Sequence, residues 1–234
     1  SARACCSEAL AAYRAAVASQ RCTSLAQVAE ALRRLSRYEA DSGNLVSAQA
    51  AAEEAVQLCA ELAGTSSESD LARLALALLA LAKVQTAAND RRATYSTRLR
   101  IKQLYETLAE RAPERFRQNL GYSLIDLGVA QSELRDFEAA ERNLRAAVGV
   151  FTALSEADGR DRREWIATAL NNLGVVQGSR NDLDGALQTF AEALKIWSVL
   201  ATEQPDRYNE EVGRTLSNRA YVLCETANLE AARA

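Results

Sequence analysis

Arginine is the residue type with the most evident binding chemistry in this sequence, and two short segments are rich in it. Residues 90–100 read DRRATYSTRLR, and residues 159–165 read GRDRREW. Guanidinium groups bind phosphate, so both segments are candidates for contact with a nucleic acid. Acidic residues are interleaved in the second segment, and no aromatic stacking platform accompanies the first. Helical-repeat RNA binders read bases with repeated polar side-chain pairs, and no such pairs occur here. We therefore expect no nucleic-acid partner.

The sequence lacks the residue types that most catalytic and metal sites require. It contains no histidine, so its serine and cysteine side chains have no imidazole base. It also contains no GxxxxGK phosphate-binding loop. The acidic pairs Glu53-Glu54 and Glu210-Glu211 are expected to be solvated helix surface. The cysteines show no CxxC spacing and are expected to be small buried helix residues; they are Cys5, Cys6, Cys22, Cys59 and Cys224. The sequence thus predicts no catalysis, no metal and no cofactor.

The composition is that of a globular helical protein. Of the 234 residues, 48% are hydrophobic and 25% are charged, which is too apolar for a disordered chain. No uncharged apolar run approaches the length of a membrane span, so we expect no membrane partner. No signal peptide or transit segment is visible, and we expect a cytoplasmic location. The sequence contains only 2 prolines and 10 glycines, so long helices with few interruptions are predicted.

A short motif recurs along the chain with a period of 46 residues. The segment LIDLG at 124–128 aligns with LNNLG at 170–174 and with LSNRA at 216–220. In the other direction it aligns with LLALA at 78–82 and LRRLS at 32–36. Five matches in one register indicate a tandem repeat.

The rest of each unit repeats as well. The segment RDFEAAERNLRAAV at 135–148 aligns with NDLDGALQTFAEAL at 181–194 and with GNLVSAQAAAEEAV at 43–56. The polar residues that begin these segments are typical of turns, and Asn or Asp there is expected to cap the helix that follows. Large apolar or aromatic residues recur later in the unit and are expected in the core; they are Tyr13, Cys59, Tyr105, Phe151 and Trp197.

Each unit is predicted to be a pair of amphipathic helices, because apolar residues recur three and four apart in both halves. One pair cannot bury both of its faces, so the pairs are expected to stack. The first helices are predicted near 23–41, 68–88, 114–134, 160–180 and 206–226. The second helices are predicted near 2–20, 45–63, 91–111, 137–156 and 183–203, with a further short helix from 229.

The chain resembles the tetratricopeptide repeat family in the residues of this repeat. These residues are Leu124, Leu127, Gly128, Phe137, Ala140, Leu144 and Ala147, with counterparts Leu170, Leu173, Gly174, Leu183, Ala186, Phe190 and Ala193. The usual unit of the family has about 34 residues. Longer units with LNNLG-like first helices are similar to arrays in actinobacterial and fungal multidomain signalling proteins. The resemblance implies an all-α fold, a right-handed α-solenoid of antiparallel helix pairs in a tetratricopeptide-like superhelix.

We expect residues 1–234 to form a single repeat domain. Its units lie near 23–63, 68–111, 114–156, 160–203 and 206–234, and residues 1–20 supply a leading second helix. Both ends of the sequence cut a unit, which suggests that the chain is a fragment of a longer protein. Alternatively, the cut ends are covered by a partner or by self-association, since the ends of a solenoid need polar caps.

The resemblance also implies that the first helices line a concave groove. The side chains expected to point into it are Arg33, Arg37, Leu79, Lys83, Ile125, Val129, Asn171, Val175, Ser217 and Tyr221. Arginine binds carboxylates with a bidentate fork. An acidic segment or a C-terminal peptide end is therefore expected near Arg33, Arg37 and Lys83, with an apolar anchor near Ile125 and Val129. The alternative is that these arginines are only solvated helix surface.

Two functions follow as expectations. The first is a protein–protein interaction scaffold that binds a peptide or protein segment in the concave groove. The second is a ligand-sensing or autoinhibitory module of a larger multidomain signalling switch, with its effector domain in the same chain.

Overall fold

The computed structural model describes residues 25–64 and 67–233, with residues 8, 11 and 15 before them and with side chains as far as Ala227. The described segments from residue 25 onward are helices joined by short turns, which confirms the predicted all-α fold for this part of the chain. The helices are α2 (Leu25–Asp41), α3 (Leu45–Ala63), α4 (Glu68–Ala87), α5 (Arg91–Arg111), α6 (Pro113–Glu133), α7 (Phe137–Asp158), α8 (Arg163–Ser179), α9 (Leu183–Glu203) and α10 (Pro205–Arg233).

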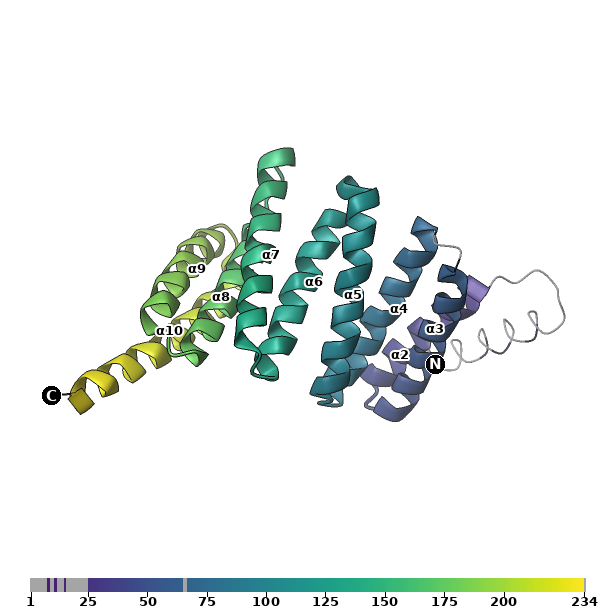
Figure 1. The fold of residues 1–234 in the computed structure, drawn as a ribbon, viewed down its shortest axis with the longest axis horizontal. Helices are drawn as coiled ribbons and strands as arrows, with labels where there is room; N and C mark the ends of the chain where they lie inside the picture. The colour runs from purple at the N-terminus through teal and green to yellow at the C-terminus, as the bar shows by residue number, and fades with distance from the viewer. Residues whose placement is uncertain (1–7, 9–10, 12–14, 16–24, 65–66, 234) are drawn as a thin grey trace. The chain divides into compact units, whose positions relative to one another are not determined.

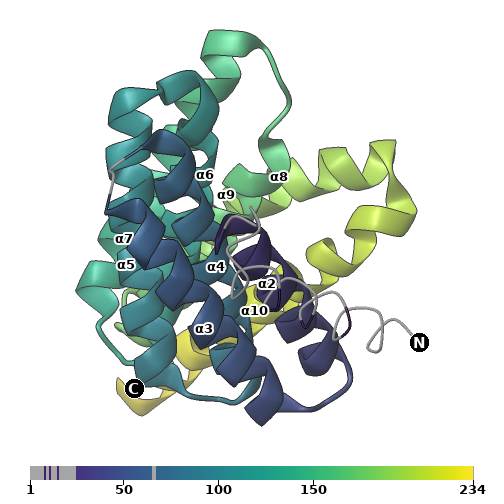
Figure 2. The same cartoon turned by 90° about the vertical axis from the view of Figure 1, so that its right-hand side faces the viewer.

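The chain divides into two compact units, Ser1–Glu114 and Arg115–Ala234. In the first unit α2 packs on α3, α3 on α4 and α4 on α5, and α2 also contacts α4 (Figures 1 and 2). In the second unit α7 packs on α8, α8 on α9 and α9 on α10, and α8 also contacts α10. Within each unit, therefore, first helices lie beside first helices of the neighbouring pair, as the repeat predicts.

The turns inside the helix pairs keep the register of the sequence repeat. The second helices begin at Leu45, Arg91, Phe137 and Leu183, which are 46 residues apart. Two residues before each start, the backbone adopts a positive φ, at Gly43, Asn89, Arg135 and Asn181. This left-handed residue reverses the chain direction and lets the second helix fold back on the first.

Helix capping follows the prediction in three of these turns and differs in the fourth. The side chains of Asp90, Asp136 and Asp182 accept hydrogen bonds from the backbone N–H groups of the residues three positions later. Asn44 makes no such cap. Its Nδ2 instead donates to Glu39 Oε2 at 2.8 Å, because the carboxylate of the preceding helix lies within reach.

The large side chains predicted for the core are buried wherever the structure describes them, and Tyr13 lies outside the described residues. Phe151 is 0% exposed, Phe190 and Trp197 are 1% exposed, and Tyr105 is 4% exposed. A Cβ added at Gly174 of α8 would lie 2.7 Å from Phe190 of α9, so the ring occupies the space that the glycine leaves. Small residues on first helices and large residues on second helices thus allow each pair to approach closely.

Two helix boundaries differ from the prediction. Residues 160–162 are not helical, because α7 ends in a left-handed Gly159 and α8 begins only at Arg163. The expected break near 227 and new helix from 229 are wrong, since α10 continues without interruption to Arg233. The helix predicted at 2–20 lies almost entirely outside the described residues. Among the described helices, none combines the length and the hydrophobicity of a membrane-spanning segment.

Candidate functional site

The structure brings four of the predicted groove residues together in the first unit. A cavity of about 250 Å³ lies between α2 and α4, and we call it the basic groove. Its lining residues are Arg33, Ser36, Arg37, Ala40, Leu76, Leu79, Ala80, Lys83 and Val84. Arg33, Arg37, Leu79 and Lys83 are therefore on one surface, as their positions in the repeat predicted.

Helix geometry explains why these residues converge. Arg33 and Arg37 are four residues apart on α2, so their side chains lie on one face of that helix. Leu79 and Lys83 have the same spacing on α4. Because α2 and α4 pack side by side, the two pairs face a common depression. The repeat places them in equivalent turns of the two first helices.

All the charged side chains that line the basic groove are cationic, and they differ in how they are paired. Arg33 is partly neutralised by Glu30, with Arg33 Nε 2.8 Å from Glu30 Oε2. Hydrogen bonding from Arg33 holds the pKa of Glu30 below its usual value, so this carboxylate is ionised near neutral pH. Lys83 Nζ lies 3.9 Å from Asp41 Oδ1, with both side chains largely exposed. Such an exposed pair is weak.

Arg37 is the cation most available to a ligand. Its side chain is exposed, and it forms no hydrogen bond or ion pair with any residue that the structure describes. A carboxylate brought to the groove would therefore replace only water around this guanidinium. Charge-assisted hydrogen bonds of this kind are shorter and stronger than neutral ones.

An apolar strip runs beside these cations. Leu76, which is not among the predicted groove residues, is 46% exposed, and Leu79 is half-buried beside it. A second cavity of about 170 Å³ shares Arg33 and Leu76 with the basic groove and reaches Cys59. Leu76 was missed because the prediction took only two positions from each first helix. The groove thus combines a cationic wall with an apolar floor.

The predicted groove residues of the second unit have mixed exposure. Val129 is half-buried, while Val175, Ser217 and Tyr221 are exposed, with Tyr221 at 69%. These side chains present surface on α6, α8 and α10, but no cavity described in this unit includes them.

Ile125 and Asn171 do not present surface to a ligand. Ile125 is 7% exposed and belongs to a core cluster with Leu124 and Leu173, so it does not supply the expected apolar anchor. Asn171 is 1% exposed, and its Oδ1 accepts a hydrogen bond from Asn218 Nδ2 at 3.2 Å. Its amide thus joins α8 to α10 in the second unit.

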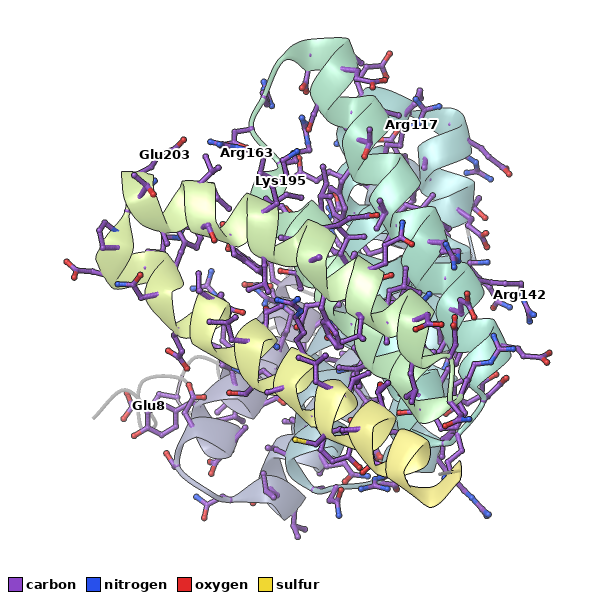
Figure 3. The ribbon with its side chains drawn as sticks, turned by 90° about the vertical axis from the view of Figure 1, so that its left-hand side faces the viewer. Glu8, Arg117, Arg142, Arg163, Lys195 and Glu203 are labelled. Carbon is purple, nitrogen blue, oxygen red and sulfur yellow. The ribbon has the colours of Figure 1, made fainter. Side chains whose placement is uncertain are left out.

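The arginines at 159–165 form ion pairs with acidic residues of the same chain. Arg162 is 5% exposed and forms a two-pronged ion pair with Asp158, at 2.6 and 2.8 Å. This hydrogen bonding holds the pKa of Asp158 well below its usual range. Arg163 binds Asp161 at 2.7 Å and Glu203 at 2.8 Å (Figure 3). Their guanidinium groups join α7, α8 and α9 at one end of the second unit.

A polar cavity of about 560 Å³ in the second unit was not predicted from the sequence. It lies between α7 and α9, with α8 beneath, and its polar lining comprises Arg145, Gln177, Asp182, Gln188, Thr189 and Glu192. Glycines contribute to its size, because Gly149 and Gly185 place no side chain there. Within the described residues, no group of three or more cysteine, aspartate or glutamate side chains is arranged to hold a metal ion.

Comparison with known proteins identifies solved structures that have a similar fold. No family model matches the sequence, and no curated protein matches it. Among solved structures, BtubC from P. vanneervenii is similar, with a TM-score of 0.65, 20% identity, and coverage of 99% of this chain and 85% of that one. A putative kinesin light chain with TPR-like repeats from Podosopora anserina gives a TM-score of 0.64 and 17% identity, and covers 91% and 95%.

A third similar structure is the apo form of RapI, with a TM-score of 0.66, 16% identity and coverage of 96% of this chain. The chain spans 58% of the length of RapI. At these identities the likeness establishes the fold. The chain therefore has the fold of the tetratricopeptide-like helical-repeat proteins, which its repeated LIDLG and LNNLG segments resemble.

Proposed function

We propose that this protein is an interaction scaffold whose basic groove binds an acidic peptide segment of a partner protein. The observation that carries the proposal is the convergence of Arg33, Arg37 and Lys83 around exposed and half-buried leucines in one cavity. A peptide that carries carboxylates and an apolar side chain is complementary to this surface. The similarity to BtubC and to the TPR-like repeats of the kinesin light chain supports the fold on which the proposal rests.

The proposed mechanism is binding to a preformed surface. The walls of the groove are helices α2 and α4, whose facing sides are fixed by their mutual contact and by α3. The protein therefore loses little conformational entropy on binding, and the flexible peptide bears most of the ordering cost. Arg37 and Lys83 would recognise carboxylates, while Leu76 and Leu79 would contact an apolar side chain.

Comparing an acidic with a neutral peptide tests whether the basic groove binds acidic segments or is only a solvated basic surface. The probe is a fluorescein-labelled peptide with two leucines flanked by Glu and Asp and with a free C-terminal carboxylate. The matched peptide carries Gln and Asn in place of the acids and ends in an amide. We expect the anisotropy of the acidic peptide to rise with protein concentration, and that of the neutral peptide to rise at least about tenfold less steeply.

Charge reversal locates the binding surface. Arg37→Glu and Lys83→Glu should each weaken binding of the acidic peptide by about tenfold, since each replaces an attraction by a repulsion. Arg92→Glu is the matched control, because Arg92 is an exposed arginine on α5 of the same unit and outside the groove. If Arg92→Glu weakens binding as much as Arg37→Glu does, the effect is one of net charge and the groove is not the site.

A further inference from the structure

One face of α10 is exposed to solvent, whereas the equivalent faces of the other first helices are covered. Leu32, Leu78, Leu124 and Leu170 occupy the same position in successive repeat units, and all are 7% exposed or less. The leucine at this position in α10, Leu216, is 48% exposed. The repeat thus identifies a core position that lies open on α10.

The position seven residues later shows the same contrast. In α4, α6 and α8 it is occupied by Gln85, Gln131 and Gln177, which are 4% to 6% exposed. In α10 it is occupied by Leu223, which is 46% exposed. A buried polar residue has therefore been replaced by an exposed apolar one, which is the reverse of what a solvated surface favours.

The equivalent faces of α6 and α8 are covered by second helices. The repeat position of Gly213 is occupied by Gly121 in α6 and by Ala167 in α8. A Cβ added at Gly121 would lie 2.7 Å from Phe151 of α7. Ala167 is 0% exposed in a core cluster with Trp197 of α9. A Cβ added at Gly213 of α10 would meet nothing within 4 Å. The face of α10 therefore has the shape that accepts a packed helix, without one in place among the described residues.

The residues that follow this face do not fold back to cover it. Ala227 stands where Gly43, Asn89, Arg135 and Asn181 adopt the left-handed conformation that reverses the chain. α10 runs straight through this point to Arg233 and extends past α8 and α9 (Figures 1 and 3). The open face consequently lies on an extended helix that is accessible from outside the unit.

The sequence of this face is self-complementary. Small residues recur every seven positions at Gly213, Ala220 and Ala227, and leucines recur at Leu216 and Leu223. This is the a and d spacing of a helix-to-helix seam. In an antiparallel pairing of two α10 helices, each leucine of one copy lies against a small residue of the other. α10 contains five acidic and four basic residues, so the net charges of two copies are small and repel each other only weakly.

We propose that a second copy of this chain packs on this face, so that the protein forms a dimer through antiparallel α10 helices. The pairing places a helix where α7 covers α6 and α9 covers α8, and it buries Leu216 and Leu223. The proposal is independent of peptide binding, because the basic groove lies in the first unit and the α10 face in the second.

Sedimentation velocity of the full chain over a wide concentration range tests the proposal. We expect a monomer–dimer equilibrium that shifts to monomer in Leu216→Glu, with at least a tenfold higher dissociation constant. Leu223→Gln should act in the same direction, and it introduces the residue that α4, α6 and α8 already have at this position. Circular dichroism of both variants shows whether the helices remain folded, and Leu223→Gln keeps the test valid if Leu216→Glu unfolds.

Val199→Glu is the matched control, because Val199 is 46% exposed like Leu223 but lies on α9. It should leave the dissociation constant unchanged. A wild-type chain that stays monomeric at the highest concentration overturns the proposal. A dimer that Leu216→Glu and Leu223→Gln leave intact overturns it as well.

Discussion

The ring of Phe151 in α7 fills the space beside Gly121 in α6, where an added Cβ would lie 2.7 Å from the ring carbon Cζ. A similar contact between a ring and a glycine occurs in the next helix pair, between Phe190 and Gly174, at the repeat positions that Leu144 and Gly128 occupy one unit earlier. Both rings are essentially inaccessible to solvent, so neither has room to move aside. The absence of a side chain at these glycines is thus a condition for the close approach of each helix pair.

This contact predicts the effect of adding one methyl group. Gly174→Ala should lower the free energy of unfolding by about 1–2 kcal/mol, because overpacking outweighs the gain in helix propensity. Gly149→Ala is the control, since Gly149 lies in α7 with nothing within 4 Å of an added Cβ. It should raise the free energy of unfolding by up to about 1 kcal/mol. Urea unfolding followed by circular dichroism measures both, and equal effects of the two changes would refute this account of the helix contact.

The left-handed turn residue at Arg135 predicts a stabilising substitution. Arg135 has a φ of 65°, a conformation that is costly for a residue with a Cβ. Arg135→Gly should therefore raise the free energy of unfolding by up to about 1 kcal/mol, less the loss of its contact with the Phe137 ring. Arg142→Gly, in the exposed interior of α7, should lower it by about 1 kcal/mol. A destabilising Arg135→Gly in thermal or urea unfolding would show that the side-chain contact outweighs the backbone strain.

The Asp158–Arg162 pair predicts how stability depends on pH. Hydrogen bonds from Arg162 and from the backbone of Arg160 lower the pKa of Asp158 in the folded protein. The unfolded chain has a pKa of about 3.9 at this residue. The carboxylate therefore stabilises the fold above that pH, and this contribution is lost as the pH falls through the lower, folded-state pKa.

Asp158→Asn is the variant that isolates this contribution. The wild type should be more stable than the variant at pH 7, and the difference should shrink as urea unfolding is repeated at about pH 4, 3 and 2. A difference in unfolding free energy that stays constant over this range would mean that the ionised carboxylate does not stabilise the fold.

Cys59 and Cys224 should differ in reactivity. Cys59 is 3% exposed, and burial raises the pKa of its thiol, so little reactive thiolate forms. Cys224 is exposed on α10, so the expectation that it is a buried helix residue is wrong. Brief treatment with N-ethylmaleimide near pH 7.5, followed by peptide mass spectrometry, should label Cys224 well before Cys59, and urea should remove the difference. Rapid labelling of native Cys59 would show that the cavity beside it opens readily.

The repeat register predicted most of the fold, because each turn contains its own local signal. The starts of α3, α5, α7 and α9 follow from the polar turn residues, and the structure places them where the sequence indicated. The end of α10 was not predicted, since the register suggested a turn near 227. Ala227 stands where Gly43, Asn89 and Asn181 favour a turn, and Arg135 turns without such a preference, so residue type at this position did not by itself decide whether the helix ends.

The candidate site was predictable only in part. The repeat register determines which way a side chain points from its helix, but it does not determine how deeply that side chain is buried. Arg33, Leu79, Ile125, Asn171 and Ser217 occupy one repeat position, yet Ile125 and Asn171 are buried while Ser217 is exposed. The long arginine side chain at 33 keeps its charge at the surface, whereas isoleucine at the same position joins the core. The polar cavity between α7 and α9 depends on the packing of three helices, and no local sequence motif predicts it.

The most direct measurement of the central claim is a charge swap across the basic groove. Isothermal titration of Arg37→Glu with the acidic peptide should show binding weakened by about tenfold. Replacing one glutamate of the peptide by arginine should restore much of that loss in Arg37→Glu and should weaken binding to the wild type. If some position in the peptide gives this reciprocal pattern, Arg37 contacts the carboxylate there. If the wild type and Arg37→Glu bind every acidic peptide equally, the claim that this groove recognises acidic segments is contradicted.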